Sequence, residues 1–253
     1  MPDHLPAFTV KIAETAADLQ AAQALRYQVF VQELGGSGDL VDHQQGLERD
    51  GFDPFVDHML VWDNTNGTLA GVYRLLREDQ AMRAGQFYCE TEYDLTELRA
   101  SGRKLLELGR SCLHPAYRGG TAMFHLWSGL AAYVEQHHIE VLFGVASFHG
   151  TDPSVLANPL SMLRQNHLAP TNLRVRARTY QPMDLVSPDD LNRRQAMIET
   201  PALIKAYLRL GGCVGDGAFI DYKFNTTDVF LILDIEKISS RQRRLYSNGR
   251  GRG

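Results

Sequence analysis

The sequence predicts an α/β (α+β) fold, in which helices flank a mixed central sheet and a further block extends the C-terminal side. Three observations support this fold class. Residues 8–12 alternate between apolar and polar side chains, which is typical of a half-buried strand. Residues 14–34 and 122–137 carry apolar side chains at helical spacing, so we expect two helices packed on a sheet. Residues 139–146 are almost entirely apolar, as in strands that are buried on both faces.

The N-terminal half is expected to continue from this strand and helix into a loop and a hairpin. The glycine-rich residues 35–38 end the helix, because glycine readily takes the left-handed conformation of a helix C-terminus. Residues 39–53 are polar and form a long loop, a kind of segment that is often functional in a compact domain. Residues 58–62 and 68–76 are apolar runs on either side of Asp-Asn-Thr-Asn-Gly, a pattern that predicts a β-hairpin.

A central strand at residues 105–113 follows a connection with weaker helical and turn patterns. With the helix and the apolar strand after it, the predicted order is strand, helix, three strands, helix, strand. The second half is expected to add further helices and strands to this core. The helices are predicted at residues 153–165, 188–198 and 201–210, and the strands at residues 173–180, 218–224 and 229–233.

The length of 253 residues, with 44% hydrophobic and 22% charged residues, is that of an ordinary globular protein. No repeat or low-complexity linker divides the chain, so we expect one domain over residues 1–238, with a distinct block at about residues 185–238. Residues 239–253 carry five arginines and no acidic residue, which predicts a disordered basic tail. Two roles for this tail stay open, namely contact with anionic lipid and solubility alone.

No run approaches the roughly eighteen apolar residues of a membrane span, and the first residues lack the features of a secretion signal. We therefore expect a cytoplasmic protein, and peripheral contact with the inner membrane stays open. Cys89, Cys112 and Cys213 are odd in number and lack metal-ligand spacing, so they are expected to be reduced and structural. Neither a metal site nor a nucleic-acid partner is expected.

Glu107 and Arg110 lie three residues apart on the central strand, which breaks into the basic turn Arg118-Gly119-Gly120 before an apolar helix. The backbone N–H groups of the turn and of the helix start suit a phosphate. A partly desolvated glutamate can accept a proton from an attacking amine. This layout is that of an acyl-transfer site. A second interpretation stays open, in which Glu107 pairs with Arg110 or Arg74 and only fixes loop geometry.

The order of elements and the turn resemble the GNAT acyltransferase superfamily. Its usual turn reads Gln/Arg-x-x-Gly-x-Gly/Ala and holds the diphosphate of coenzyme A. Here Thr121 follows Gly119-Gly120 at a position where a glycine is expected. The resemblance implies a GNAT-like fold, and the altered turn favours the single phosphate of the phosphopantetheine on acyl carrier protein as the acyl donor. No permanently bound cofactor is implied.

A more specific resemblance, which covers about the first half of the chain, is to the acyl-homoserine-lactone synthases. The matching residues are Arg26-x3-Phe30, Glu48-Arg49-Asp50-Gly51-Phe52-Asp53, Gly71-Val72-Tyr73-Arg74 and Glu107-x2-Arg110. This resemblance implies a substrate site that includes Arg26, Phe30, Asp50, Asp53 and Arg74. Two roles stay open for the aspartates, namely binding a side-chain ammonium and ordering the loop through the arginines.

The segments 201–211 and 224–229 resemble the family of ornithine N-acyltransferases, and this resemblance covers most of the chain. It implies transfer of a 3-hydroxyacyl group from acyl carrier protein to the α-amino group of ornithine, which gives lyso-ornithine lipid. Three alternatives stay open: an enzyme like the lactone synthases, an N-acyltransferase for another amino acid such as glutamine, and a non-enzymatic, hemolysin-like membrane-active protein.

Two further sets of residues complete the expected site. The backbone near Ser111 and Cys112 is expected to donate hydrogen bonds to the thioester oxygen, whereas the Cys112 thiol is expected to be packing rather than an acyl acceptor. Arg174, Arg176 and Arg178 alternate along a predicted strand and would face an acidic carrier protein. A solvated edge strand with a role in solubility alone is the alternative for these arginines.

Overall fold

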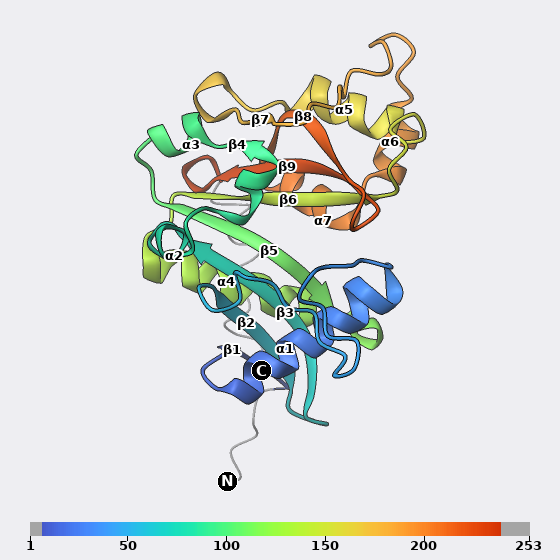
Figure 1. The fold of residues 1–253 in the computed structure, drawn as a ribbon. Coiled ribbons are helices and arrows are strands. Elements are labelled where there is room, and N and C mark those ends of the chain that lie inside the picture. The colour runs from blue at the N-terminus through green and yellow to red at the C-terminus, as the bar shows by residue number, and fades with distance from the viewer. Residues whose placement is uncertain (1–6, 239–253) are drawn as a thin grey trace. The chain divides into compact units, whose positions relative to one another are not determined.

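The computed structural model describes residues 7–238, which form two compact units (Figure 1). Unit 1 contains residues 7–84 and 108–138, and unit 2 contains residues 85–107 and 139–238. Each unit is described by itself, so the expectation of a single domain over residues 1–238 stays a prediction. The basic tail predicted at residues 239–253 lies outside the described residues.

Unit 1 is a sheet covered by two helices. Its elements are β1 (Phe8–Ile12), α1 (Ala16–Arg26), the π-helical segment η1 (Tyr27–Glu33), β2 (Asp57–Asp63), β3 (Thr68–Arg77), α2 (Glu78–Ala84), the 3-10 turn η3 (Pro115–Tyr117) and α4 (Ala122–His137). The strand order is β1-β2-β3-β5, where β5 (Leu105–Leu113) gives its C-terminal part to this unit. The first two pairings are antiparallel, and Gly67 provides the positive φ that the hairpin turn requires.

The helices of unit 1 lie on opposite faces of its sheet, with α1 in front and α4 behind in Figure 1. A capping box between Thr15 and Asp18 begins α1, because each side chain accepts a hydrogen bond from the backbone of the other. On the other face, α4 approaches β1 so closely that a Cβ on Gly129 would lie 2.6 Å from Val10. Both helices therefore bury apolar surface against the same strands, which fixes the strands that carry the candidate site.

The first helix differs from its predicted form. We expected one helix over residues 14–34, but α1 ends at Arg26 and continues as seven π-helical residues. The Leu34 N–H donates to Val29 O and the Gly36 N–H to Phe30 O, both longer-range bonds than those of an α-helix. Apolar spacing does not distinguish the two helix types, so the wider turn could not be read from the sequence. Such segments are frequent at functional sites.

Unit 2 is built on a mixed sheet of order β5-β6-β9-β8-β7-β4. Its elements are η2 (Tyr88–Thr91), β4 (Tyr93–Asp94), α3 (Thr96–Ala100), the start of β5, β6 (Val141–His149), α5 (Ala157–His167), η4 (Thr171–Leu173), β7 (Arg176–Ala177), α6 (Arg193–Glu199), α7 (Ala202–Arg209), β8 (Cys213–Asp221), β9 (Thr226–Asp234) and η5 (Ile235–Lys237). The β5–β6 pairing is parallel, and β9 is antiparallel to β6 and β8. The predicted mixed sheet with flanking helices is thus confirmed.

One predicted strand of the second half is largely absent. Residues 173–180 were expected to form a strand, but only Arg176 and Ala177 do so. The chain before them is a 3-10 turn closed by Leu173 N–H to Pro170 O, and a proline start commits these residues to a turn. The register of this short strand pairs Tyr93 with Ala177. Three alternating arginines therefore do not line one strand.

Among residues 7–238, none of the helices combines the length and the apolar character that crossing a bilayer requires.

Candidate active site

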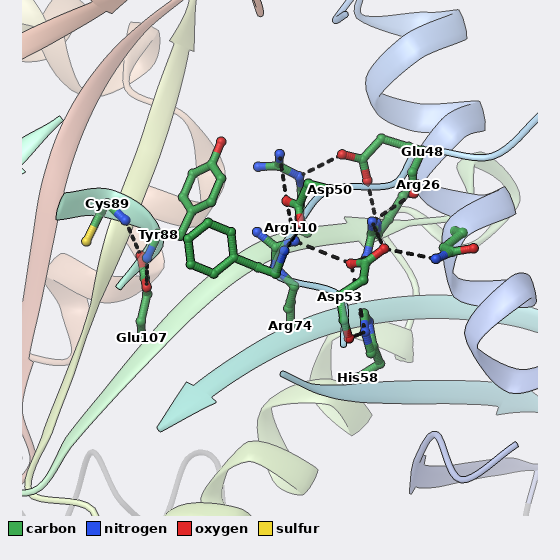
Figure 2. Close-up of polar contacts among 12 residues, drawn as sticks. Arg26, Glu48, Asp50, Asp53, His58, Arg74, Tyr88, Cys89, Glu107 and Arg110 are labelled. Carbon is green, nitrogen blue, oxygen red and sulfur yellow. Dashed lines mark hydrogen bonds and ion pairs between the residues drawn. The ribbon is translucent and has the colours of Figure 1, made fainter. Parts of the chain in front are cut away.

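A buried network of charged side chains in unit 1 is centred on Arg26, whose side chain is fully enclosed (Figure 2). Its Nε donates to Glu48 Oε2 at 2.5 Å, and its Nη2 donates to the Glu48 carbonyl oxygen at 2.8 Å. Its Nη1 and Nη2 donate to the two carboxylate oxygens of Asp53, at 2.8 and 3.0 Å. Because Arg26 is the last residue of α1, this network attaches the long loop to the helix.

Two further arginines bring neighbouring strands into the network. Arg74, on β3, donates to Asp50 and lies 3.5 Å from Asp53. Arg110, on β5, donates through Nε to Glu48 at 3.1 Å and lies 3.5 Å from Asp50. Three guanidinium groups therefore face three carboxylates, and their formal charges cancel. Among the predicted substrate residues, the structure brings Arg26, Asp50, Asp53, Arg74 and Arg110 together.

Two phenylalanines lie over guanidinium groups of this network. The Phe30 ring, on η1, is 6.0 Å from the Arg110 guanidinium carbon. The Phe52 ring, on the loop, is 5.9 Å from the corresponding carbon of Arg74. An aromatic face attracts a cation at this distance and excludes water from one side of it. Phe30 thus belongs to the network, as the spacing Arg26-x3-Phe30 implied.

The charges of the arginines determine the protonation of the loop carboxylates. Burial raises the pKa of Asp50, but the Arg74 and Arg110 charges outweigh it and lower that pKa to about 2. Burial likewise opposes ionisation of Asp53, and Arg26 outweighs it, so the pKa of Asp53 is lowered. Both groups are ionised at neutral pH and do not accept a proton there. The arrangement therefore serves to order the loop.

The sequence interpretation missed two residues of the network, Gln23 and His58. The Gln23 Nε2 donates to Asp53 at 2.9 Å, and its position three residues before Arg26 on α1 was the signal that could have found it. The His58 Nε2 lies 3.3 Å from the Asp53 carbonyl oxygen, and His58 is the cross-strand partner of Arg74. Burial, and then the Arg26 charge, lower the pKa of His58, so its imidazole is neutral.

The backbone of β5 is bent at Arg110, where φ is 49°. A left-handed conformation costs a non-glycine residue about 1–2 kcal/mol, so the contacts of the Arg110 side chain must hold it. Ser111 follows and is half-buried. Cys112 packs against Ala22 and Leu25 of α1, and burial raises the pKa of its thiol to about 12. A thiol in this state is a poor nucleophile, which favours the packing role.

Glu107 belongs to unit 2, where its carboxylate is 3% exposed and is held by backbone amides (Figure 2). Its Oε2 accepts the Tyr88 N–H at 2.7 Å, and its Oε1 accepts the Cys89 N–H at 2.8 Å. These are the first two N–H groups of η2. Amide donors stabilise the negative charge of a carboxylate without neutralising it. Burial, and then the Glu107 charge, raise the pKa of the Cys89 thiol.

The predicted phosphate turn lies in unit 1. Gly119 takes a positive φ of 77°, and a Cβ there would meet no atom within 4 Å. Thr121 is the N-cap of α4 and makes no side-chain cap hydrogen bond. The Gly120 N–H bonds the Tyr117 carbonyl oxygen. Arg118 is held by a carboxylate, since its two Nη atoms each lie 2.6 Å from an oxygen of Glu33.

The three arginines expected to meet a carrier protein differ in exposure. Arg176 and Arg178 are exposed, whereas Arg174 is half-buried and donates to the Ala169 carbonyl oxygen at 2.8 Å. The Arg176 guanidinium pairs with Asp216 at 2.8 Å, and the Arg178 Nε donates to a backbone oxygen. All three retain unshared N–H donors in principle, because a guanidinium carries five.

Unit 2 also contains a group of carboxylates that spacing in the sequence did not reveal. Oxygens of Glu92, Asp221 and Asp228 all lie within 4.8 Å of one another, and Glu92 and Asp228 are buried. Carboxylates at this separation can hold a cation. The expectation that the protein has no metal site stays a prediction.

Comparisons with known proteins identify the family. Residues 25–128 match the model of an acetyltransferase (GNAT) domain. The chain is 55% identical over 252 residues to the L-ornithine N(alpha)-acyltransferase of Rhodobacter capsulatus, and the match covers 96% of this chain and 97% of that protein. It is 44% identical over 246 residues to the enzyme of the same name from Brucella abortus, with coverages of 94% and 88%.

Solved structures support the same fold. FeeM, an N-acyl amino acid synthase from uncultured soil microbes, matches with a TM-score of 0.54 and 12% identity, covering 95% of this chain and 98% of that chain. The AHL synthase LasI matches with a TM-score of 0.50 and 18% identity, covering 96% and 95%. At these identities the likeness concerns the fold alone. Taken with the close relatives, it establishes that the chain belongs to the L-ornithine N(alpha)-acyltransferase family, a family of enzymes with the GNAT fold.

Proposed function

We propose that this chain transfers a 3-hydroxyacyl group from acyl carrier protein to the α-amino group of L-ornithine, giving lyso-ornithine lipid in lipid biosynthesis. The observation that carries the proposal is the 55% identity, over 96% of the chain, to an L-ornithine N(alpha)-acyltransferase. The altered phosphate turn at Thr121, which resembles the coenzyme A turn only in part, supports the carrier-bound donor. The donor and the product are the parts of this proposal that need a direct test.

In the proposed reaction the α-amino nitrogen attacks the thioester carbonyl carbon. The new C–N bond forms, the C–S bond breaks, and the phosphopantetheine leaves as a thiol. An α-amino group has a pKa of about 8 and must first lose a proton, because only the neutral amine is nucleophilic. Glu107 is our candidate for the acceptor of that proton. Its two amide donors favour the ionised carboxylate, which is the form that a general base needs at the outset.

The oxygen of the thioester gains negative charge during the attack and needs preorganised donors. The left-handed conformation of Arg110 redirects the strand immediately before Ser111 and Cys112. We assign the oxyanion donors to the backbone N–H groups of these residues and not to their side chains. The burial of the Cys112 thiol supports this assignment, because it argues against a covalent acyl-enzyme.

The acceptor is an amino acid with a carboxylate and, in ornithine, a side-chain ammonium. Arg110 is the most exposed arginine of the network, at 13% of its side chain, and its fork suits the substrate carboxylate. Asp50 and Asp53 are already paired with guanidinium groups. For these two aspartates we therefore favour the ordering of the loop over binding of the ammonium.

The carrier supplies a phosphate and an acidic surface. Arg118, Gly119 and Gly120, together with the uncapped start of α4, are proposed to receive the phosphate of the phosphopantetheine. Arg176 and Arg178 are proposed to meet acidic side chains of the carrier, with a smaller part for the half-buried Arg174. Because the product is an amphiphile, we also propose a cytoplasmic location with peripheral contact at the inner membrane.

Mass spectrometry of the products tests this function. The protein is incubated with 3-hydroxyacyl carrier protein and, in separate reactions, with ornithine, glutamine or S-adenosylmethionine. Acylation of ornithine at its α-amino group supports the proposal. Acylation of glutamine instead, or release of methylthioadenosine, would assign the acceptor to one of the two alternative enzymes. An absence of transfer from the carrier, with transfer from 3-hydroxyacyl-coenzyme A, would contradict the proposed donor.

A further inference from the structure

The ion pair between Glu33 and Arg118 occupies the turn that the proposed function assigns to a phosphate. Both oxygens of Glu33 accept hydrogen bonds from Arg118, at 2.6 Å each, in the parallel geometry that arginine also offers to phosphate. Each partner holds the other ionised, since the hydrogen bond lowers the pKa of Glu33 and raises that of Arg118. A carboxylate thus stands where an anionic ligand would otherwise meet this arginine.

The two residues come from segments that both unit 1 and the sequence keep separate. Glu33 is the last residue of the π-helical segment η1, and Arg118 opens the glycine turn before α4. The hydrogen bonds of α4 begin with His125 N–H to Thr121 O, so the N–H groups of its first turn precede the helical ladder. This first turn contains no acidic residue. The negative charge at the turn therefore comes from Glu33, across from the helix.

We propose that Glu33 is a specificity residue that engages Arg118 and thereby selects the single phosphate of a carrier-bound phosphopantetheine over the several phosphates of coenzyme A. This inference rests on the proposed carrier-dependent function, which it deepens. It assigns the choice of donor to a residue outside the glycine turn itself. Thr121, which stands where a glycine is expected in the turn, acts in the same direction.

The physical basis is the difference in charge between the two donors. A phosphodiester carries one negative charge, whereas coenzyme A, with its diphosphate and its 3′-phosphate, carries about three more. Charges within about 10 Å of Glu33 are repelled by its carboxylate at moderate ionic strength. Both partners of the pair are near 40% exposed, at 42% for Arg118 and 39% for Glu33. An ion pair so exposed exchanges partners at little cost, so one phosphate can still compete for Arg118.

The test compares two donors that carry the same 3-hydroxyacyl chain, one on carrier protein and one on coenzyme A. For Glu33→Gln we expect kcat/KM with the coenzyme A donor to rise about 5- to 10-fold, mostly through KM, and to fall back toward wild type as salt is added. We expect a change below about 2-fold with the carrier donor, which has fewer charges near the turn. Glu135→Gln is the matched control, because Glu135 is an exposed residue in the last turns of α4 and its loss should leave both donors unchanged.

The double variant Glu33→Gln/Arg118→Met tests whether the gain acts through Arg118, and it should lose most of the gain. Persistence of the full gain without Arg118, or an equal rise for both donors, would overturn the proposal. Calorimetric binding of coenzyme A alone to the same variants separates this inference from the proposed function. Tighter binding to Glu33→Gln than to Glu135→Gln supports the role of Glu33 whichever donor the wild-type enzyme uses, and equal binding refutes it.

Discussion

Two buried carboxylates, Asp53 in unit 1 and Glu107 in unit 2, are stabilised in different ways. Asp53 accepts hydrogen bonds from the Arg26 guanidinium at 2.8 and 3.0 Å. Glu107 accepts hydrogen bonds from the backbone N–H groups of Tyr88 and Cys89, at 2.7 and 2.8 Å. The partners of Asp53 bring a full positive charge, whereas those of Glu107 bring only dipoles.

This difference indicates which carboxylate remains chemically useful. A carboxylate paired with arginine is neutralised as a pair, and protonating it would leave a buried cation without a partner. A carboxylate held by amides keeps its negative charge, so a proton that it accepts creates no unpaired charge in its surroundings. We therefore assign structural ordering to the network around Arg26 and proton transfer to Glu107.

The largest effect on folding is expected from Arg26→Met. Removing this fully buried guanidinium leaves Glu48 and Asp53 with one cation fewer, and we expect the free energy of unfolding to fall by about 3–5 kcal/mol. Chemical denaturation measures the change. Arg49→Met is the control on the same loop, since Arg49 is 37% exposed and its loss should cost about 0–1 kcal/mol. Similar losses for both variants would remove the distinction between network and surface.

Replacements of Arg110 separate its side chain from its backbone conformation. Both Arg110→Ala and Arg110→Gly remove the guanidinium, but only glycine takes the left-handed φ of 49° without strain. We expect the alanine variant to be less stable than the glycine variant by about 1 kcal/mol, and to have the lower kcat if the bend orients the oxyanion donors. Both should raise the KM for ornithine. An alanine variant as stable as the glycine variant would show that the bend is unstrained.

A smaller effect is expected from pH through His58. Burial and Arg26 lower the pKa of His58 in the folded protein below its ordinary value of 6.5. The unfolded chain therefore binds a proton that the folded chain does not, and the free energy of unfolding falls as the pH drops below about 6.5. The contribution of neutral His58 is fully present above that pH.

Denaturation at several pH values between 7.5 and 5 should show this slope, and the slope should be smaller in His58→Gln. The exposed His149 provides the control variant His149→Gln, whose slope should match that of the wild type. The lowered pKa values of Asp50 and Asp53 act at more acidic pH and do not affect this window. An unchanged slope in His58→Gln would indicate that another group titrates in this range.

The core of the fold was readable from the sequence where periodicity was strong. Residues 8–12 and 105–113 form β1 and β5 with the predicted bounds, and 122–137 forms α4. The strand predicted at 173–180 failed because it has only two residues with a neighbour to pair with, a property of the partner strands and not of the segment. The helix predicted at 188–198 begins only at Arg193, after Asn192 caps it.

The candidate site was readable as a set of residues but not as a set of contacts. Spacing predicted Arg26, the acidic loop, Arg74 and Arg110, and the structure brings them into one network. The partners of Glu107 could not be predicted, because backbone amides belong to no residue type and leave no pattern in the sequence. For the same reason the engagement of Arg118 by Glu33, 85 positions earlier, had no signal.

The most direct test of the contrast between the two carboxylates measures turnover and unfolding for Glu107→Gln and Asp53→Asn side by side. We predict that Glu107→Gln lowers kcat by about 100- to 10,000-fold at neutral pH, while its unfolding free energy falls by only about 1–2 kcal/mol. Asp53→Asn should lose about 3–5 kcal/mol of stability and keep most of its kcat in the folded fraction. Near-normal turnover of Glu107→Gln would contradict the account.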